Sequence, residues 1–119
     1  MSKTILAVVD DMIFKSKIRA AAEQLDVEVK FPRSKESAIA AVDESPPKLI
    51  VADLQNQKLD TLELARELKA DEKKREIVLV GFFSHVEIQL RNDAQAAGYD
   101  RVMPRSEFFA NLAKILTGQ

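Results

Sequence analysis

Lys48-Leu49-Ile50-Val51-Ala52-Asp53 is a short apolar run that ends in an aspartate, and Pro46 and Pro47 precede it. Apolar residues without polar alternation predict a strand that is buried on both faces. The two prolines exclude a helix that runs straight into this strand. Because a lone carboxylate is costly to bury, we expect Asp53 at the carboxyl end of the strand, where the chain leaves the core. Ligands of open α/β sheets bind at that edge.

Further strands precede and follow this run, and they differ in pattern. Residues 5–9 and 77–83 are apolar throughout, residues 27–31 alternate, and residues 100–103 form a short last strand. Apolar residues at helical spacing separate the strands. The candidate helix N-caps are Asp10 or Asp11, Ser34, Asp60 or Thr61, Ser84 and Ser106.

This alternation predicts an α/β fold with parallel strands, right-handed crossovers and helices on both faces of the sheet. The alternating strand at residues 27–31 belongs at an edge, and the fully apolar strands belong in the middle. The expected strand order is therefore the flavodoxin-like order 2-1-3-4-5, in a three-layer sandwich with a five-stranded parallel sheet.

The composition indicates one globular domain and excludes several functions. The chain has 119 residues, which fits a single domain over residues 1–119. Its formal net charge is -1, so the charge balance gives no reason to expect contact with nucleic acid. The absence of cysteine excludes disulfides, thiolate zinc sites and cysteine nucleophiles, and it agrees with a cytoplasmic protein. No signal peptide or membrane-spanning run is recognisable.

Polar residues that suit phosphoryl chemistry follow the predicted strands. The first and third strands are neighbours in the expected order, so Asp10, Asp11 and Asp53 should converge. Crowded carboxylates need a compensating cation, and magnesium prefers such ligands. Ser84 follows the fourth strand and Arg105 the fifth, which adds a hydroxyl and a fixed positive charge. This set suits a phosphoryl group carried on a carboxylate.

With these residues in place, essentially the whole chain resembles the receiver domain of two-component response regulators, a CheY-like fold. The stretch Val8 to Asp11 is similar to the family's acidic pair, and Asp53 lies where the family has its phosphoacceptor. The stretch Leu59 to Leu64 is similar to the start of the family's third helix, and Ala96-Ala97-Gly98 is similar to the end of its fourth.

The resemblance implies phosphorelay signal transduction by a domain that is not an enzyme. A sensor histidine kinase or phosphotransfer protein would phosphorylate Asp53, with Mg²⁺ held by Asp10, Asp11, Asp53 and the backbone carbonyl of Gln55. Ser84 and Arg105 would contact the phosphoryl group. A downstream protein would bind the face of the fourth helix, fifth strand and fifth helix, and a homodimer is compatible with this. Direct contact with nucleic acid or a membrane is not expected.

The chain departs from the family where the response to phosphorylation is made. Gln57 replaces a usual proline, Thr61 a glycine, Arg105 the near-universal lysine, Ser106 the following proline, and Val102 the switch aromatic. Counting back from Gly98 places Phe83 on the switch Ser/Thr position, and Ser84 fits only if the next loop is one residue shorter. The alternative hypothesis is therefore a phosphorylation-independent pseudo-receiver, which acts as a protein–protein interaction module.

The replacement of the family's Lys-Pro pair by Arg105-Ser106 also predicts the geometry of this loop. A cis peptide before a non-proline costs about 2.5–4 kcal/mol, so the Arg105–Ser106 bond should be trans and Arg105 should point away from Asp53. A flavin or small-ligand protein is disfavoured because the first strand leads into Asp10-Asp11 and not into a Ser/Thr/Gly-rich loop. A nucleotide hydrolase is disfavoured because no G-x-x-x-x-G-K-[ST] motif occurs. The chain is expected to be a single-domain regulator or part of a longer protein.

Overall fold

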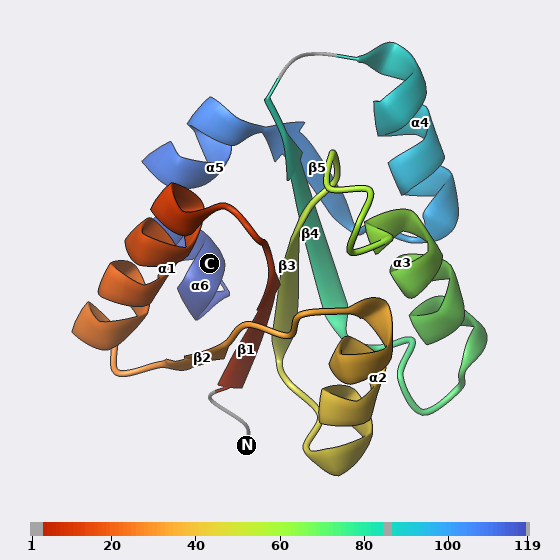
Figure 1. Ribbon diagram of the computed structural model, residues 1–119, viewed down its shortest axis with the longest axis horizontal. Coiled ribbons are helices and arrows are strands. Elements are labelled where there is room, and N and C mark those ends of the chain that lie inside the picture. Colours follow the sequence, from red (N-terminus) through yellow and green to blue (C-terminus); the bar gives the residue numbers. More distant parts are fainter. Residues whose placement is uncertain (1–3, 85–86, 119) are drawn as a thin grey trace.

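A five-stranded parallel sheet forms the middle layer of the structure, a computed structural model that describes residues 4–84 and 87–118 (Figure 1). The strand order β2-β1-β3-β4-β5 confirms the predicted order and the flavodoxin-like, CheY-like fold class. The strands are β1 (Thr4–Val8), β2 (Glu28–Lys30), β3 (Leu49–Asp53), β4 (Val78–Phe83) and β5 (Arg101–Pro104). The short alternating strand β2 lies at one edge, and the apolar strands β1, β3 and β4 occupy the middle.

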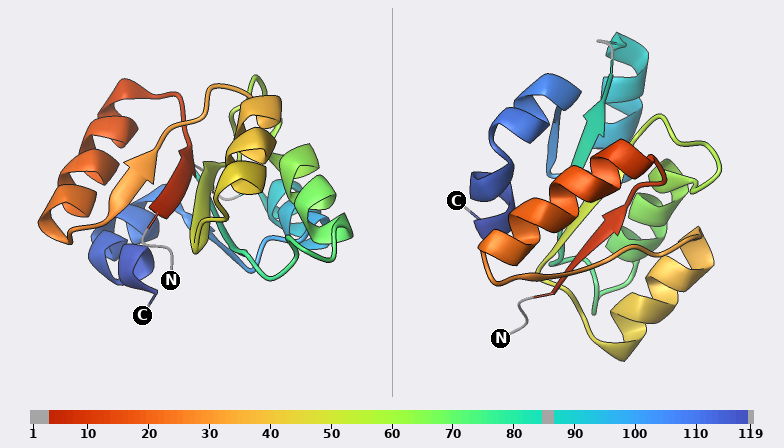
Figure 2. Two further views of the ribbon diagram at one scale, coloured as in Figure 1. Left: turned by 90° about the horizontal axis from the view of Figure 1, so that it is seen from below. Right: turned by 60° about the vertical axis from the view of Figure 1, so that its left-hand side comes forward.

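Helices cover both faces of the sheet (Figures 1 and 2). One face packs against α2 (Lys35–Glu44), α3 (Thr61–Ala70) and α4 (Ile88–Ala97). The other face packs against α1 (Met12–Gln24), α5 (Arg105–Ala110) and α6 (Leu112–Thr117).

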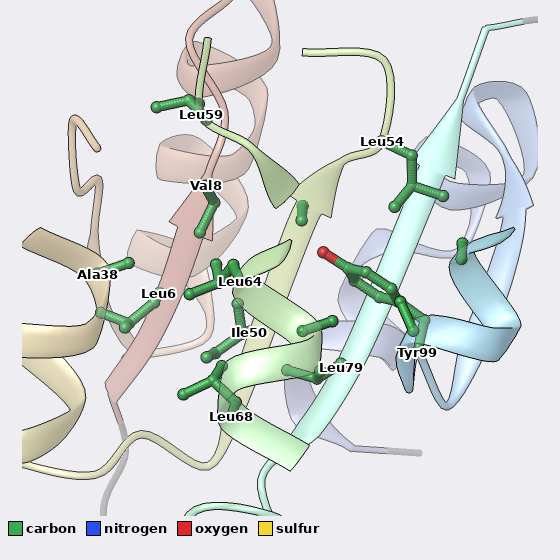
Figure 3. Close-up of a cluster of buried hydrophobic side chains, with 14 of the residues drawn as sticks. Leu6, Val8, Ala38, Ile50, Leu54, Leu59, Leu64, Leu68, Leu79 and Tyr99 are labelled. Carbon is green, nitrogen blue, oxygen red and sulfur yellow. The ribbon is translucent and has the colours of Figure 1, made fainter. Parts of the chain in front are cut away.

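Alternate residues of the central strands enter two separate cores, because successive side chains of a strand point to opposite faces. Leu6, Val8 and Ile50 point toward the α2, α3 and α4 side, where Leu64 and Leu68 of α3 meet them (Figure 3). The residues between them in the chain, which include Ala7 and Val51, join the other core. This two-sided burial explains why the central strands are apolar throughout.

The sequence located some helix starts correctly. Asp11 caps α1, since its side chain accepts hydrogen bonds from two backbone amides of the first turn. Ser34 caps α2, and Ser37 completes a capping box in place of the usual glutamate. Thr61 is the first residue of α3, whereas Asp60 makes no side-chain cap and has a left-handed backbone with φ 48°.

Two predicted caps were wrong. Ser84 does not cap α4, because that helix begins at Ile88 after Glu87, and residues 85–86 lie outside the described part of the chain. Ser106 does not cap the last helix, because helical structure already begins at Arg105, directly after Pro104. The last helical segment is also divided at Asn111 into α5 and α6.

The end of α3 is joined to the rest of the molecule through Lys69. Its ammonium group donates hydrogen bonds to the backbone oxygens of Arg75 and Ile77, at 2.9 and 3.1 Å, and forms an ion pair with Asp100 at 3.2 Å. Gly98 ends α4 with φ 119°, and a Cβ atom there would collide with Lys69 Cγ. Glycine at this position therefore satisfies both the turn and the close packing. No helix in the described ranges is long and apolar enough to cross a membrane.

Candidate functional site

Asp53 lies at the carboxyl end of β3, in the middle of the sheet. It is half-buried, and its Oδ1 accepts a hydrogen bond of 3.0 Å from the Gln55 backbone amide. Burial raises the pKa of Asp53 above its usual value, the Gln55 hydrogen bond opposes this, Asp11 raises the pKa further and Arg105 lowers it. The carboxylate of Asp53 therefore interacts electrostatically with both neighbours that the sequence placed beside it.

Asp11 performs a structural task as well as an electrostatic one. Its Oδ1 accepts hydrogen bonds from the backbone amides of Ile13 and Phe14, at 2.9 and 3.0 Å, and so caps α1. Both bonds go to one oxygen, so capping uses only part of the carboxylate. Asp10 precedes it in the loop after β1, and both aspartates are exposed.

That Asp10, Asp11 and Asp53 together hold a metal ion stays a prediction. Within residues 4–84 and 87–118, no three carboxylate, imidazole or thiolate groups lie close enough together to form a metal-binding cluster. Asp11 accepts hydrogen bonds from amides of the first turn of α1, which need acceptors. Asp11 also lies close enough to Asp53 to interact with it electrostatically.

Gln55 joins Asp53 to Ser84, a contact that the sequence analysis missed. Its side-chain Oε1 accepts hydrogen bonds from the Ser84 backbone amide at 2.7 Å and from the Ser84 hydroxyl at 2.6 Å. Phe83, the other candidate for the hydroxyl position, is buried in the core on the α3 side. Ser84 is thus the residue that reaches the rim, and its hydroxyl already has a partner.

Arg105 is placed at the same edge of the sheet but contacts an aromatic ring. No described peptide bond is cis, so the predicted trans Arg105–Ser106 bond is confirmed. The guanidinium lies over the ring of Phe14, 5.3 Å from its centroid. No described ion pair joins Arg105 to a carboxylate. Arg105 therefore acts on Asp53 through its charge and not through a direct salt bridge.

A buried chain of two hydrogen bonds ties the backbone of Asp53 to the connection between α4 and β5. The Thr61 hydroxyl donates to the Asp53 backbone oxygen at 3.1 Å, and the Tyr99 hydroxyl donates to the Thr61 backbone oxygen at 2.7 Å. Thr61 is 2% exposed and Tyr99 6% exposed. Burial raises the pKa of Tyr99. Figure 3 shows the Tyr99 hydroxyl pointing from the α4 side toward α3.

The sequence carried a partial signal for this chain of bonds. The sequence marks Thr61 as a candidate start of the third helix and as a departure from the family's glycine, but it predicts no contact for Tyr99, the single tyrosine. A tyrosine that follows a helix-ending glycine and precedes a short strand is a candidate for burial with its hydroxyl paired. Val102, at the expected aromatic position, is instead a partly buried aliphatic residue that packs against the same core.

Comparison with known proteins identifies structural but not sequence relatives. No family model and no curated protein sequence matches the chain. A response regulator from Hahella chejuensis is 20% identical, with 98% of this chain and 93% of that chain covered at a TM-score of 0.86. The phosphorylated cyanobacterial phytochrome response regulator RcpA is 23% identical, with 99% of this chain and 91% of that chain covered at a TM-score of 0.82.

A third structure includes a metal. The receiver domain of the sensor histidine kinase PA1611 from Pseudomonas aeruginosa PAO1, with a magnesium ion coordinated in its active-site cleft, is 21% identical. The likeness covers 99% of this chain and 97% of that chain, at a TM-score of 0.83. These likenesses show that the chain has the receiver-domain fold over nearly its whole length.

Proposed function

We propose that this chain, which has the receiver-domain fold, accepts a phosphoryl group on Asp53 within a two-component signalling system. The observation that carries the proposal is a half-buried carboxylate at the carboxyl end of a central parallel strand, with Asp11 and Arg105 close enough to affect its pKa. Ligands of this sheet type bind at that edge. The donor would be a phosphohistidine of a sensor histidine kinase or a phosphotransfer protein.

The chemistry that the site supports is transfer to a carboxylate. A free oxygen of the Asp53 carboxylate attacks phosphorus, the bond from phosphorus to the donor nitrogen breaks, and its electron pair leaves with the donor. The Gln55 amide, bonded to Oδ1, fixes the orientation of the carboxylate. The Arg105 charge, which favours the ionised form of Asp53, keeps more of the nucleophile available.

The residues present fit a magnesium ion. Mg²⁺ is usually held in proteins by one or two carboxylates and several waters, and Asp11 and Asp53 would supply the two carboxylates. Capping of α1 uses only Oδ1 of Asp11, and Asp10 and the Gln55 backbone carbonyl are the further candidate ligands. The ion would neutralise charge on the transferring phosphoryl oxygens.

The proposal extends to the partner that the domain binds and to where it acts. The face of α4, β5 and α5 would bind a downstream protein partner or a second copy of the chain. The domain would act in the cytoplasm as a signalling module, not as an enzyme, without direct contact with nucleic acid or a membrane.

A second candidate function is a phosphorylation-independent pseudo-receiver that works by protein contacts alone. Two observations favour it: the Ser84 hydroxyl is bonded to Gln55, and the Arg105 guanidinium lies over Phe14. Both groups that would contact a phosphoryl group are therefore engaged elsewhere.

Intact-mass measurement after incubation with acetyl phosphate and Mg²⁺ separates the two candidates. Phosphorylation predicts one added phosphoryl group on the parent protein and none on Asp53→Asn. The control is Asp43→Asn, because Asp43 lies on α2 and pairs with Lys74, away from the site. Modification of the control and not of Asp53→Asn would confirm the acceptor, and an unmodified parent protein would leave the pseudo-receiver as the function.

A further inference from the structure

Val78 is an unusual residue for a central strand, because 42% of its side chain is exposed. It is the first residue of β4, and it lies beside Leu49, the first residue of β3. On this face of the sheet α6 ends at Thr117, followed by Gly118, and leaves a pocket of about 180 Å³ at the amino ends of the strands. The pocket is at the opposite end of the sheet from Asp53, and Figure 2 shows this end from below.

Four apolar residues and two residues with cationic side chains are among those that line this pocket. Leu49, Val80 and Ile115 are buried and form part of the lining. The charged residues among them are Lys48 and Arg101, and no described Asp or Glu lines the pocket. Neither cation takes part in an ion pair of the described part of the chain.

We propose that this pocket, lined by Lys48, Leu49, Val78, Val80, Arg101 and Ile115, binds a small organic carboxylate with a compact apolar body. The size supports this class of ligand, because an apolar protein cavity of about 150 Å³ takes up benzene. The charges support it as well, because the planar fork of an arginine matches a carboxylate and a lysine adds a second cation. The apolar part of the lining disfavours inorganic phosphate, which has no apolar part to bury.

A titration with benzoate, followed by amide and methyl chemical shifts of the full chain, tests the proposal. Benzoate should give saturable shifts at Leu49, Val80 and Ile115, with a Kd of about 1 mM. Benzyl alcohol, which has the same ring without the charge, should bind about tenfold more weakly, and benzylamine should not bind. Inorganic phosphate should cause no shift of these residues.

Variants assign the effect to the two cations. Arg101→Gln and Lys48→Gln should each weaken benzoate binding about fivefold, whereas Lys114→Gln, an exposed cation on α6 outside the pocket, should not change the Kd. Val78→Phe should block the pocket, and because Val78 is already partly exposed the variant should fold.

Several results would overturn the proposal. These are the absence of saturable shifts, equal affinity for benzoate and benzyl alcohol, or the same loss of affinity in Lys114→Gln as in Arg101→Gln. The site is independent of the phosphoryl site, so Asp53→Asn should bind benzoate as the parent protein does.

Discussion

Replacing Tyr99 by phenylalanine removes a single oxygen from the interior, and the structure allows its effect to be estimated. The hydroxyl is 2.7 Å from the Thr61 backbone oxygen, and the residue is 6% exposed. A buried hydrogen bond contributes about 1 kcal/mol to stability. Thr61 opens α3, so its carbonyl can also accept from the amide four residues on, and the change leaves no acceptor wholly unpaired.

We therefore expect Tyr99→Phe to lower the free energy of unfolding by about 1 kcal/mol. For a chain of 119 residues this corresponds to a fall in Tm of about 4 °C. Urea denaturation followed by circular dichroism measures the free energy. The control is Thr117→Val, whose hydroxyl is bonded to Ala113 on the exposed side of α6 and should change stability by less than about 0.5 kcal/mol.

The same residue predicts a specific dependence on pH. Burial raises the pKa of Tyr99, so the phenol is neutral in both states below its usual pKa of about 10. Above that pH the unfolded chain loses the proton first, and the stability of the parent protein should fall as pH rises. The loss should be smaller in Tyr99→Phe. Because this is the only tyrosine and there is no tryptophan, the absorbance of ionised phenol reports Tyr99 alone. Ionisation near pH 10 in the folded protein, or a variant as stable as the parent, would refute the reasoning.

Three further predictions concern the proposed phosphoryl site. Asp11→Asn should keep the cap of α1 and change the free energy of unfolding by less than about 0.5 kcal/mol, but it should abolish the rise in Tm with millimolar Mg²⁺. Asp11→Ala should also lose about 1 kcal/mol of stability with the cap. A rise in Tm with Mg²⁺ in Asp11→Asn would exclude the shared metal site. Asp53→Asn should be more stable than the parent protein at neutral pH, because burial raises the pKa of Asp53 and makes its ionised form unfavourable. In thermal melts the difference in stability should shrink as the pH falls toward about 4, and a difference that stays constant would contradict this. Arg105→Ala should leave binding of a beryllium fluoride mimic almost unchanged while losing about 0.5–1 kcal/mol from the contact with Phe14, and a large loss of binding would show that the guanidinium turns to Asp53.

The sheet could be predicted from the sequence because each strand carries its own pattern. Residues 49–52 and 78–83 are apolar throughout and belong to inner strands, and residues 28–30 alternate and lie at the edge. The position of Asp53 followed from the cost of burying a charge. These inferences use only local composition and the rules of parallel sheets, so they do not depend on how side chains pack.

The contacts that set the properties of the site could not be predicted in this way. Gln55 and Ser84 are 29 residues apart, and Thr61 and Tyr99 are 38 apart. Whether such groups meet depends on the register of neighbouring strands and on rotamers, which a single sequence does not specify. The cap predicted at Ser84 was wrong because α4 begins four residues later, at Ile88, and the Ser84 hydroxyl instead bonds to Gln55.

The bond between Gln55 and Ser84 limits how much Ser84 itself could contribute to a response to phosphorylation. An arriving phosphoryl group would offer Ser84 a charged acceptor in place of the neutral amide oxygen that it has now. Hydrogen bonds to neutral groups contribute about 1 kcal/mol and those to charged groups about 1.5–3 kcal/mol, so the exchange gains about 1 kcal/mol. That difference changes the ratio of two conformations about fivefold, whereas an almost complete change of state needs about 10⁴-fold. The exchange of partners at Ser84 would therefore fall far short of an almost complete change of state by itself.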